Sequence, residues 1–437
     1  MQIVSSSLKT KLNLALPIFL GQIGFTINGL CDNLMVSKLG ILPLASFSLA
    51  NNLLFIFFSF NLGFTLMITP LISQKYHENK FEDIGHLLFN GSILYFFVGF
   101  LLFTFLIFIG NNLNIFGQTQ EVINYTKPYF RIISYSFIPS ALLQVLKQFS
   151  DGMEKTKQAM YPILFTIILN IFLNYILIFG KFGFNRFGLM GSAYGSLFSR
   201  CLLFIILLIT LLYSSKTKIV LKNYFSNKFC FASIKQIFKL STFSSFQIFF
   251  KIILITSTVI LAGRFGSLLQ AGNQIILSIY NLLFAVPFSL AVASAITVTR
   301  NPSKTKFLKI TLFSFIKISI TFIIPIVVFI TILKTQIVSL YTNYQTLAQS
   351  VYNVFIFLVI FYIFDSIETI ILGTLRGLKE TIYPFFMTSS VYIFISIPLS
   401  FVFIQKMALN GIWLGLSIGS FVSLFLLLLR FRFLIKK

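Results

Sequence analysis

The chain has 437 residues, of which 57% are apolar and 10% are charged, and its mean hydropathy is +0.93. A water-facing surface needs far more charge, so the composition excludes a soluble domain. The formal net charge of +24 does not indicate nucleic-acid binding, because the basic residues stand singly in short loops and form no stripe beside aromatic residues.

Apolar runs that could cross a bilayer recur along the whole chain. Each span needs about 20 residues, because a helix rises about 1.5 Å per residue and the hydrocarbon core is about 30 Å thick. Twelve runs qualify, at residues 12–36, 41–71, 84–109, 126–147, 158–180, 187–214, 235–263, 271–299, 306–333, 349–374, 381–405 and 409–433. The sequence therefore predicts an all-α integral membrane protein with twelve transmembrane helices.

The chain repeats itself after about 225 residues. Residues 151–156 and 376–381 are two similar polar stretches with a proline a few residues later, and residues 36–40 resemble 262–266. Glycine in Asp151-Gly152 and Arg376-Gly377 permits a positive φ and the charges suit a helix end, so we interpret both as hinge and topology elements. A duplication of this kind predicts two pseudo-symmetric six-helix bundles around a cavity.

The predicted bundles comprise residues 1–214 and 235–437, joined by a connection at 215–234. That connection is basic, and most of the Lys and Arg residues fall on the side of the membrane that holds both termini. Because basic loops stay inside the cell, we expect both termini and the connection to be cytoplasmic. The first span lacks a short apolar region with a cleavage site, so we expect it to be retained in the membrane.

The first half contains few polar residues at membrane depth. Asp32 lies in the first span after Gln22 and Asn28, and Asn170 and Asn174 lie one turn apart on the fifth. An ionisable residue there costs at least about 2.5–3.5 kcal/mol and is a functional candidate by default. Two structural alternatives stay open: Asp32 at a helix end that touches headgroups, and the amides as interhelical hydrogen bonds.

The second half contributes Asp365 in the tenth span, with Glu368 one turn further on. A carboxylate in a low-dielectric cavity can hold a proton or Na⁺ and release it when water or another cation enters. Because one carboxylate seldom holds both an ion and a cationic substrate, competition leads to exchange. The amide oxygens of Asn170 and Asn174 also suit a hard cation.

Signs of enzymatic chemistry are missing. His77 and His86 are the two histidines, and no carboxylate cluster or nucleophile–base pair accompanies them. No phosphate-binding Gly-rich loop with Lys and Ser or Thr occurs, so we expect an ion gradient to power any transport. The sequence predicts no enzyme, no cofactor and no metal centre, apart from a coupling ion, Na⁺ or H⁺.

One set of residues, spread over about 12–430, forms a familiar pattern: 16–17, 22, 29, 32, 35, 39–40, 147–157, 169–175, 179–183, 364–366 and 372–377. This pattern resembles the multidrug and toxic compound extrusion (MATE) transporters, in particular their NorM-like branch. The resemblance implies two bundles arranged in a V and export of small organic cations or drugs by alternating access. It also implies that the protein lies in the inner (plasma) membrane, and we expect a monomer.

The resemblance also assigns ion sites. In that family the counterpart of Asp32 works with those of Asn170 and Asn174 in a cation site, which here would hold Na⁺ or H⁺. A small hydroxyl of the sixth span is sometimes included, and Ser196 is its match here. The NorM-like branch has a second site, in which the counterpart of Asp365 acts with a glutamate of the seventh span.

The seventh span departs from the family pattern. Lys251 stands where that glutamate is expected, and Thr242-Phe243 replaces the usual Leu-Pro. One hypothesis is that the Lys251 ammonium replaces the mobile cation beside Asp365 and locks this ion site. The alternative is that Lys251 extends to the membrane interface and touches nothing.

Two rival functions stay open. A flippase for lipid-linked precursors shares the two-bundle plan, and Arg200 and Lys251 would suit a pyrophosphate. A non-transporting scaffold is suggested by the altered seventh span, although Asp32, Asn170, Asn174 and Asp365 are all present. We favour a cation-coupled multidrug antiporter, with Gln22, Arg200, Lys251 and Glu368 as further charge partners or selectivity residues.

Overall fold

The computed structural model describes residues 7–116, 119–222, 224, 227–342 and 344–436. Within these ranges the chain contains helices and no strand. Twelve helical segments are long and apolar enough to cross a membrane, at Leu8–Ser37, Ile41–His77, Phe81–Asn111, Gln120–Gly152, Thr156–Phe179, Leu189–Tyr213, Phe231–Arg264, Leu268–Val298, Thr305–Ile332, Gln345–Gly377, Ile382–Met407 and Leu409–Leu434. Each overlaps one predicted span, which confirms the all-α, twelve-helix prediction.

The chain forms two compact units, and we describe each separately. The N-terminal unit is Leu20–Ser245, and the C-terminal unit is Met1–Phe19 with Phe246–Lys437. Helices α1 (Leu8–Ser37) and α10 (Phe231–Arg264) each contribute residues to both units. The repeat boundaries at 214 and 235 stay a prediction.

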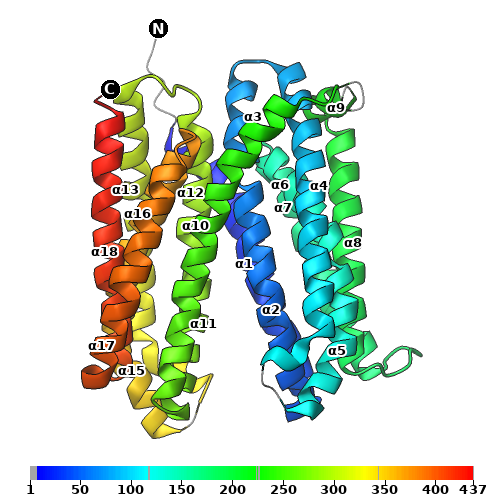
Figure 1. Ribbon diagram of the computed structural model, residues 1–437, viewed down its shortest axis with the longest axis vertical. Coiled ribbons are helices and arrows are strands. Elements are labelled where there is room, and N and C mark those ends of the chain that lie inside the picture. The colour runs from blue at the N-terminus through cyan, green and yellow to red at the C-terminus, as the bar shows by residue number, and fades with distance from the viewer. Residues whose placement is uncertain (1–6, 117–118, 223, 225–226, 343, 437) are drawn as a thin grey trace. The chain divides into compact units, whose positions relative to one another are not determined.

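The helices follow one another with short connections (Figure 1). Between α1 and α10 the chain forms α2 (Ile41–Thr65), α3 (Ile68–His77), α4 (Phe81–Asn111), η1 (Leu113–Phe116), α5 (Gln120–Tyr135), α6 (Phe137–Gly152), α7 (Thr156–Phe179), α8 (Leu189–Tyr213) and α9 (Ser215–Lys222). After α10 come α11 (Ser267–Leu283), α12 (Ala285–Val298), α13 (Thr305–Ile332), α14 (Lys334–Ser339), α15 (Gln345–Gly377), α16 (Ile382–Val391), the π-helix Tyr392–Ser396, α17 (Ile397–Met407) and α18 (Leu409–Leu434).

Prolines explain why four spans are interrupted. Proline cannot donate a hydrogen bond to the carbonyl four residues earlier, and its ring clashes with that carbonyl. α2, α5 and α11 end four or five residues before Pro70, Pro139 and Pro287, and the next helix begins almost at once. Pro398 is the second residue of α17, and the carbonyl four residues before it, that of Phe394, belongs to the π-helix. These spans therefore bend at their prolines.

The two polar turns of the repeat have matching backbones. The left-handed residue is Glu154 in the first turn (φ +57°) and Lys379 in the second (φ +63°). Our interpretation that Gly152 and Gly377 provide the positive φ is therefore wrong, because both end their helices in a helical conformation. Both glycines instead allow close helix packing.

That packing is tight in both halves. A Cβ atom on Gly152 would lie 2.8 Å from the Thr69 carbonyl oxygen on α3, and one on Gly377 would lie 2.5 Å from the Ala295 carbonyl oxygen on α12. A second matched pair opens α8 and α18, where Gly188 (φ +55°, ψ −130°) and Ala408 (φ +50°, ψ −133°) are the N-cap residues. The repeat read from the sequence thus extends to the backbone.

Each unit has its own apolar core. In the C-terminal unit the fully buried Trp413 packs edge-on against Phe361 and donates a hydrogen bond to Asn273 Oδ1 (3.1 Å). In the N-terminal unit the rings of Phe130 and Phe137 are fully buried.

Candidate functional site

Asp32 forms the centre of a polar cluster in the N-terminal unit. Its side chain lies on α1, and the residue is 8% exposed. Asn174 Nδ2 on α7 donates to Asp32 Oδ1 (2.7 Å), and Asn28 Nδ2 lies 3.4 Å from Asp32 Oδ2. The carboxylate is therefore held by neutral amides.

The two asparagines of α7 extend the cluster to α8. Asn174 Nδ2 also donates to Asn170 Oδ1 (3.2 Å), and Asn170 Nδ2 donates to Ser199 Oγ (3.2 Å). Ser196 is buried on the same helix, one turn before Ser199. The sequence reasoning missed Ser199, although its spacing of three from Ser196 places both on one helix face.

Small residues on α8 make room for this arrangement. Gly191 and Gly195 form a Gly-x-x-x-Gly pattern, which lets two helices approach closely in a membrane. A Cβ on Gly191 would lie 2.5 Å from the Leu177 carbonyl oxygen, and one on Gly195 would lie 2.0 Å from Asn174 Oδ1. Gly195 therefore fixes where the Asn174 amide can sit.

Two further predicted residues lie at different places in this unit. Arg200 is one turn beyond Ser196 on α8, and its guanidinium donates to Ser136 Oγ (2.6 Å). The guanidinium also lies 4.8 Å from the centre of the Phe58 ring and interacts electrostatically with Asp32. Gln22 is ten residues before Asp32, about 15 Å along the helix. The structure thus places Arg200, and not Gln22, near the cluster.

The cluster is rich in oxygen atoms that could face a cation. Asn28 Oδ1 and Asn174 Oδ1 are buried and have no hydrogen-bond partner among the described residues, and the Asp32 carboxylate lies beside them. Carboxylate and amide oxygens are the ligands that hard cations prefer. No group of three or more His, Cys, Asp or Glu side chains suited to a metal ion occurs in the described part of the chain.

Asp365 is the centre of a second cluster, in the C-terminal unit. Asp365 on α15 is 1% exposed. Lys251 Nζ on α10 lies 2.6 Å from Asp365 Oδ1, and the Tyr280 hydroxyl on α11 donates to Asp365 Oδ2 (2.8 Å). Both oxygens of this carboxylate therefore have a partner, one of them charged.

The Lys251 ammonium is also held from other sides. It donates to Thr369 Oγ1 (3.3 Å) and lies 4.6 Å from the centre of the Phe284 ring. The contact that the sequence hypothesis requires is present, and Lys251 does not extend free of partners to an interface. Whether the contact locks an ion site is a separate, functional question.

Glu368 lies one turn beyond Asp365 and bonds to different helices. Its Oε1 accepts hydrogen bonds from the Tyr392 hydroxyl (2.6 Å) in the π-helix and from Ser423 Oγ (2.9 Å) on α18. Tyr280 and Tyr392 could not be singled out from the sequence, because aromatic residues make up 17% of the chain.

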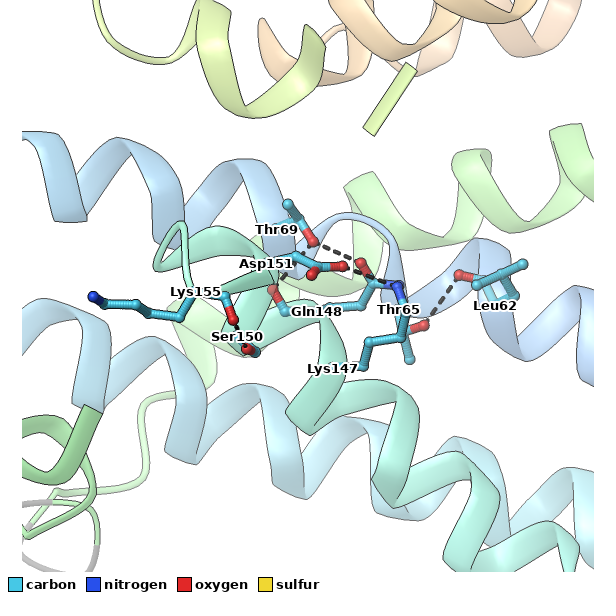
Figure 2. A network of polar contacts seen from close by, with 8 residues as sticks. All are labelled: Leu62, Thr65, Thr69, Lys147, Gln148, Ser150, Asp151 and Lys155. Atoms are coloured by element: carbon cyan, nitrogen blue, oxygen red, sulfur yellow. Dashed lines mark hydrogen bonds and ion pairs between the residues drawn. The ribbon is translucent and has the colours of Figure 1, made fainter. Parts of the chain in front are cut away.

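The turn at the end of α6 contains a buried ion pair (Figure 2). Lys147 Nζ lies 2.9 Å from Asp151 Oδ2, and the Asp151 side chain is 1% exposed. Next to it, Thr69 Oγ1 donates to Gln148 Oε1 (2.6 Å), which joins α3 to α6. Asp151 therefore lies at the end of α6, and its charge is balanced by a lysine one turn earlier on the same helix.

Comparison with known proteins identifies the family. The model of the MatE family matches residues 17–176 and 244–402, which is most of the chain and both halves of the repeat. The chain belongs to the multidrug and toxic compound extrusion (MATE) family. The recognition made from the sequence is thereby confirmed.

Relatives match this MATE chain over nearly its whole length. "Probable multidrug resistance protein NorM" of Bacillus anthracis is 27% identical over 437 residues, which cover 98% of this chain and 96% of the relative. The protein of the same name from Photorhabdus laumondii is 27% identical over 431 residues, covering 96% and 94%.

Solved structures show the same fold. The eukaryotic MATE transporter AtDTX14 superposes with a TM-score of 0.87 at 20% identity, covering 98% of this chain and 97% of that one. A MOP superfamily transporter from Pyrococcus furiosus gives a TM-score of 0.85 at 18% identity, covering 98% and 96%.

Proposed function

We propose that this MATE protein is a multidrug efflux antiporter that exports small organic cations in exchange for Na⁺ or H⁺ by alternating access. The observation that carries the proposal is the buried Asp32 cluster, in which amides surround a carboxylate without neutralising it. The names of the NorM relatives support multidrug export. The protein would act as a monomer in the inner membrane, with both termini in the cytoplasm.

In this mechanism Asp32 binds the coupling ion. Asn170 and Asn174 supply amide oxygens, and their hydrogen bonds hold the carboxylate in place. Entry of a cation or proton neutralises Asp32, which removes the attraction for a cationic substrate and favours its release. Departure of the ion restores the charge, so that substrate and ion exchange by competition.

Lys251 would keep the second cluster out of this exchange. A tethered ammonium already balances Asp365, so a mobile cation gains little by entering. The same ion pair weakens the flippase alternative, because the Lys251 charge is no longer available for a pyrophosphate group.

Gradient-driven efflux from proteoliposomes tests the proposal. Vesicles that contain the protein and ethidium are given a Na⁺ gradient, a H⁺ gradient or no gradient. We expect efflux with one of the two gradients only, and its loss in Asp32→Asn. Efflux that is independent of both gradients, or the absence of efflux, would contradict the antiporter proposal and favour the flippase.

A further inference from the structure

Glu368 is a buried carboxyl group that the proposed exchange at Asp32 does not use. The residue is 0% exposed, and its two oxygens differ sharply in their surroundings. Oε1 accepts two hydrogen bonds, from Tyr392 and Ser423, whereas Oε2 is buried without a partner among the described residues.

The charges around Glu368 do not balance an ionised carboxylate. Asp365, one turn earlier on the same helix, holds the ammonium of Lys251, and Tyr280 from α11 donates to Asp365 and not to Glu368. A single positive charge thus stands beside two carboxyl groups. Electrostatic attraction from Lys251 is opposed by repulsion from Asp365.

The other helices that pack against α15 bring no further cation to Glu368. α12 has no ionisable side chain, and the lysines of α13 are exposed on its outer side. From α18 the contact is the neutral hydroxyl of Ser423, and from the π-helix it is the phenol of Tyr392. Glu368 therefore faces hydroxyl groups and apolar residues.

An isolated carboxylate in such a place costs several kcal/mol, whereas a neutral carboxylic acid costs far less. The hydrogen bonds allow the neutral acid. Oε1 accepts twice, as the carbonyl oxygen of a carboxylic acid does, and Oε2 is left for the proton. Tyr392 belongs to a π-helix, a rare element that is often found at functional sites.

We propose that Glu368 is a proton-binding site of the C-terminal unit, with the proton on Oε2. The carboxylate takes a proton from hydronium and leaves water, and it returns the proton to water when the site is hydrated. This site goes beyond the proposed antiport, because the exchange at Asp32 does not use Glu368. Proton binding itself does not depend on transport.

Infrared spectroscopy of the full-length protein in lipid tests the site directly. The carbonyl stretching band of protonated carboxyl groups is recorded at neutral pH in Asp32→Asn. This substitution removes Asp32, whose carboxyl group is also buried and has no lysine partner among the described residues. We expect this band in Asp32→Asn and its loss in Asp32→Asn/Glu368→Gln. An unchanged band in the double variant would overturn the proposal. Absence of the band in the Asp32→Asn protein would also overturn it, and this is the result expected if Glu368 binds Na⁺ instead.

A second pair of variants covers the case in which Glu368→Gln fails to fold. Tyr392→Phe removes a hydrogen bond to the carbonyl oxygen, so the band should move to higher wavenumber. Tyr362→Phe is the matched control, because the Tyr362 hydroxyl donates to the Leu283 carbonyl oxygen (3.0 Å) and not to Glu368. A band that moves in neither variant, or equally in both, would refute the assignment.

Transport measurements separate the two proposals. If the antiport proposal fails, wild-type protein shows no gradient-driven ethidium efflux, and the infrared band of Glu368 is still present. If the Glu368 proposal fails, efflux is normal and the band does not respond to Glu368→Gln.

Discussion

Asp32 and Asp365 are both buried aspartates, and their partners give them different chemistry. Asp32 is held by the neutral amides of Asn174 and Asn28, and it also interacts with Arg200 through space. Asp365 has the Lys251 ammonium at 2.6 Å. A tethered cation cannot leave, whereas an amide cage allows a mobile ion to enter and depart. At the scale of single residues, these partners support the proposal that ions exchange at Asp32.

Loss of Lys251 should destabilise the protein, because it leaves Asp365 buried and unpaired. We expect Lys251→Met to lower the free energy of unfolding by about 3–5 kcal/mol. Removal of both charges in Lys251→Met/Asp365→Leu should recover most of the loss. Thermal unfolding in detergent checks this, and equal melting temperatures for wild type and Lys251→Met would argue against the ion pair.

Gly195→Ala should damage the Asp32 cluster specifically. The new methyl group would occupy the place of Asn174 Oδ1, 2.0 Å away, and push the amide off Asp32. We expect gradient-driven efflux to fall at least tenfold. Gly29→Ala is the control, because Gly29 lies on the same helix as Asp32 and a Cβ added there would have no atom within 4 Å. Equal efflux in both variants would mean that Asn174 does not position Asp32.

The sequence identified the buried carboxylates but not all of their partners. Asp32, Asn170 and Asn174 stand out because polar residues are rare in apolar spans. Ser199, Tyr280 and Tyr392 do not stand out, because serines and aromatic residues are common throughout the chain. Lys251 was found through its departure from the family pattern, and its contact with Asp365 required the structure.

At the scale of the helix, span positions could be predicted and bends could not. Length and apolarity define a span, so all twelve were found. Pro70, Pro139 and Pro287 follow interruptions, whereas Pro17 and Pro162 lie inside continuous helices. Neighbouring groups can satisfy the backbone around a proline in a membrane, and the sequence does not show where they do so.

Ala408→Gly should stabilise the start of α18. Ala408 has φ +50° and ψ −133°, a conformation that glycine adopts without strain, and its counterpart is Gly188. We expect a gain of about 1 kcal/mol in unfolding free energy and a higher melting temperature. The reciprocal change Gly188→Ala should lower it. A drop in stability for Ala408→Gly would contradict the inferred strain.

Gly377→Ala should destabilise the contact between α15 and α12. Its Cβ would lie 2.3 Å from Val298 Cγ2 and 2.5 Å from the Ala295 carbonyl oxygen, and backbone cannot easily move aside. We expect a loss of about 1–3 kcal/mol, as for other overpacked sites. Melting temperatures of Gly377→Ala and Gly29→Ala provide the comparison, and no difference between them would show that the helices separate at little cost.

At the scale of the whole molecule, the duplication repeats the backbone and not the chemistry. When residues 36–40 are aligned with 262–266, Thr258 is the counterpart of Asp32. When the two polar turns are aligned, Ser140 is the counterpart of Asp365. Thr258 accepts from Asn273 (3.0 Å) and Ser140 donates to the Ser136 carbonyl oxygen (2.7 Å), so both are neutral. The Asp32 cluster and the Asp365 cluster therefore each lack an acidic counterpart at the equivalent position of the other half.

This asymmetry leads to the central claim, that Asp32 exchanges ions and the Lys251–Asp365 pair does not. Ethidium efflux from proteoliposomes, driven by the gradient that powers the wild type, tests it most directly with Asp32→Asn beside Lys251→Met/Asp365→Leu. We predict that Asp32→Asn abolishes efflux and that the double variant, whose charges are removed together, keeps it. Efflux that survives Asp32→Asn and disappears in the double variant would contradict the claim.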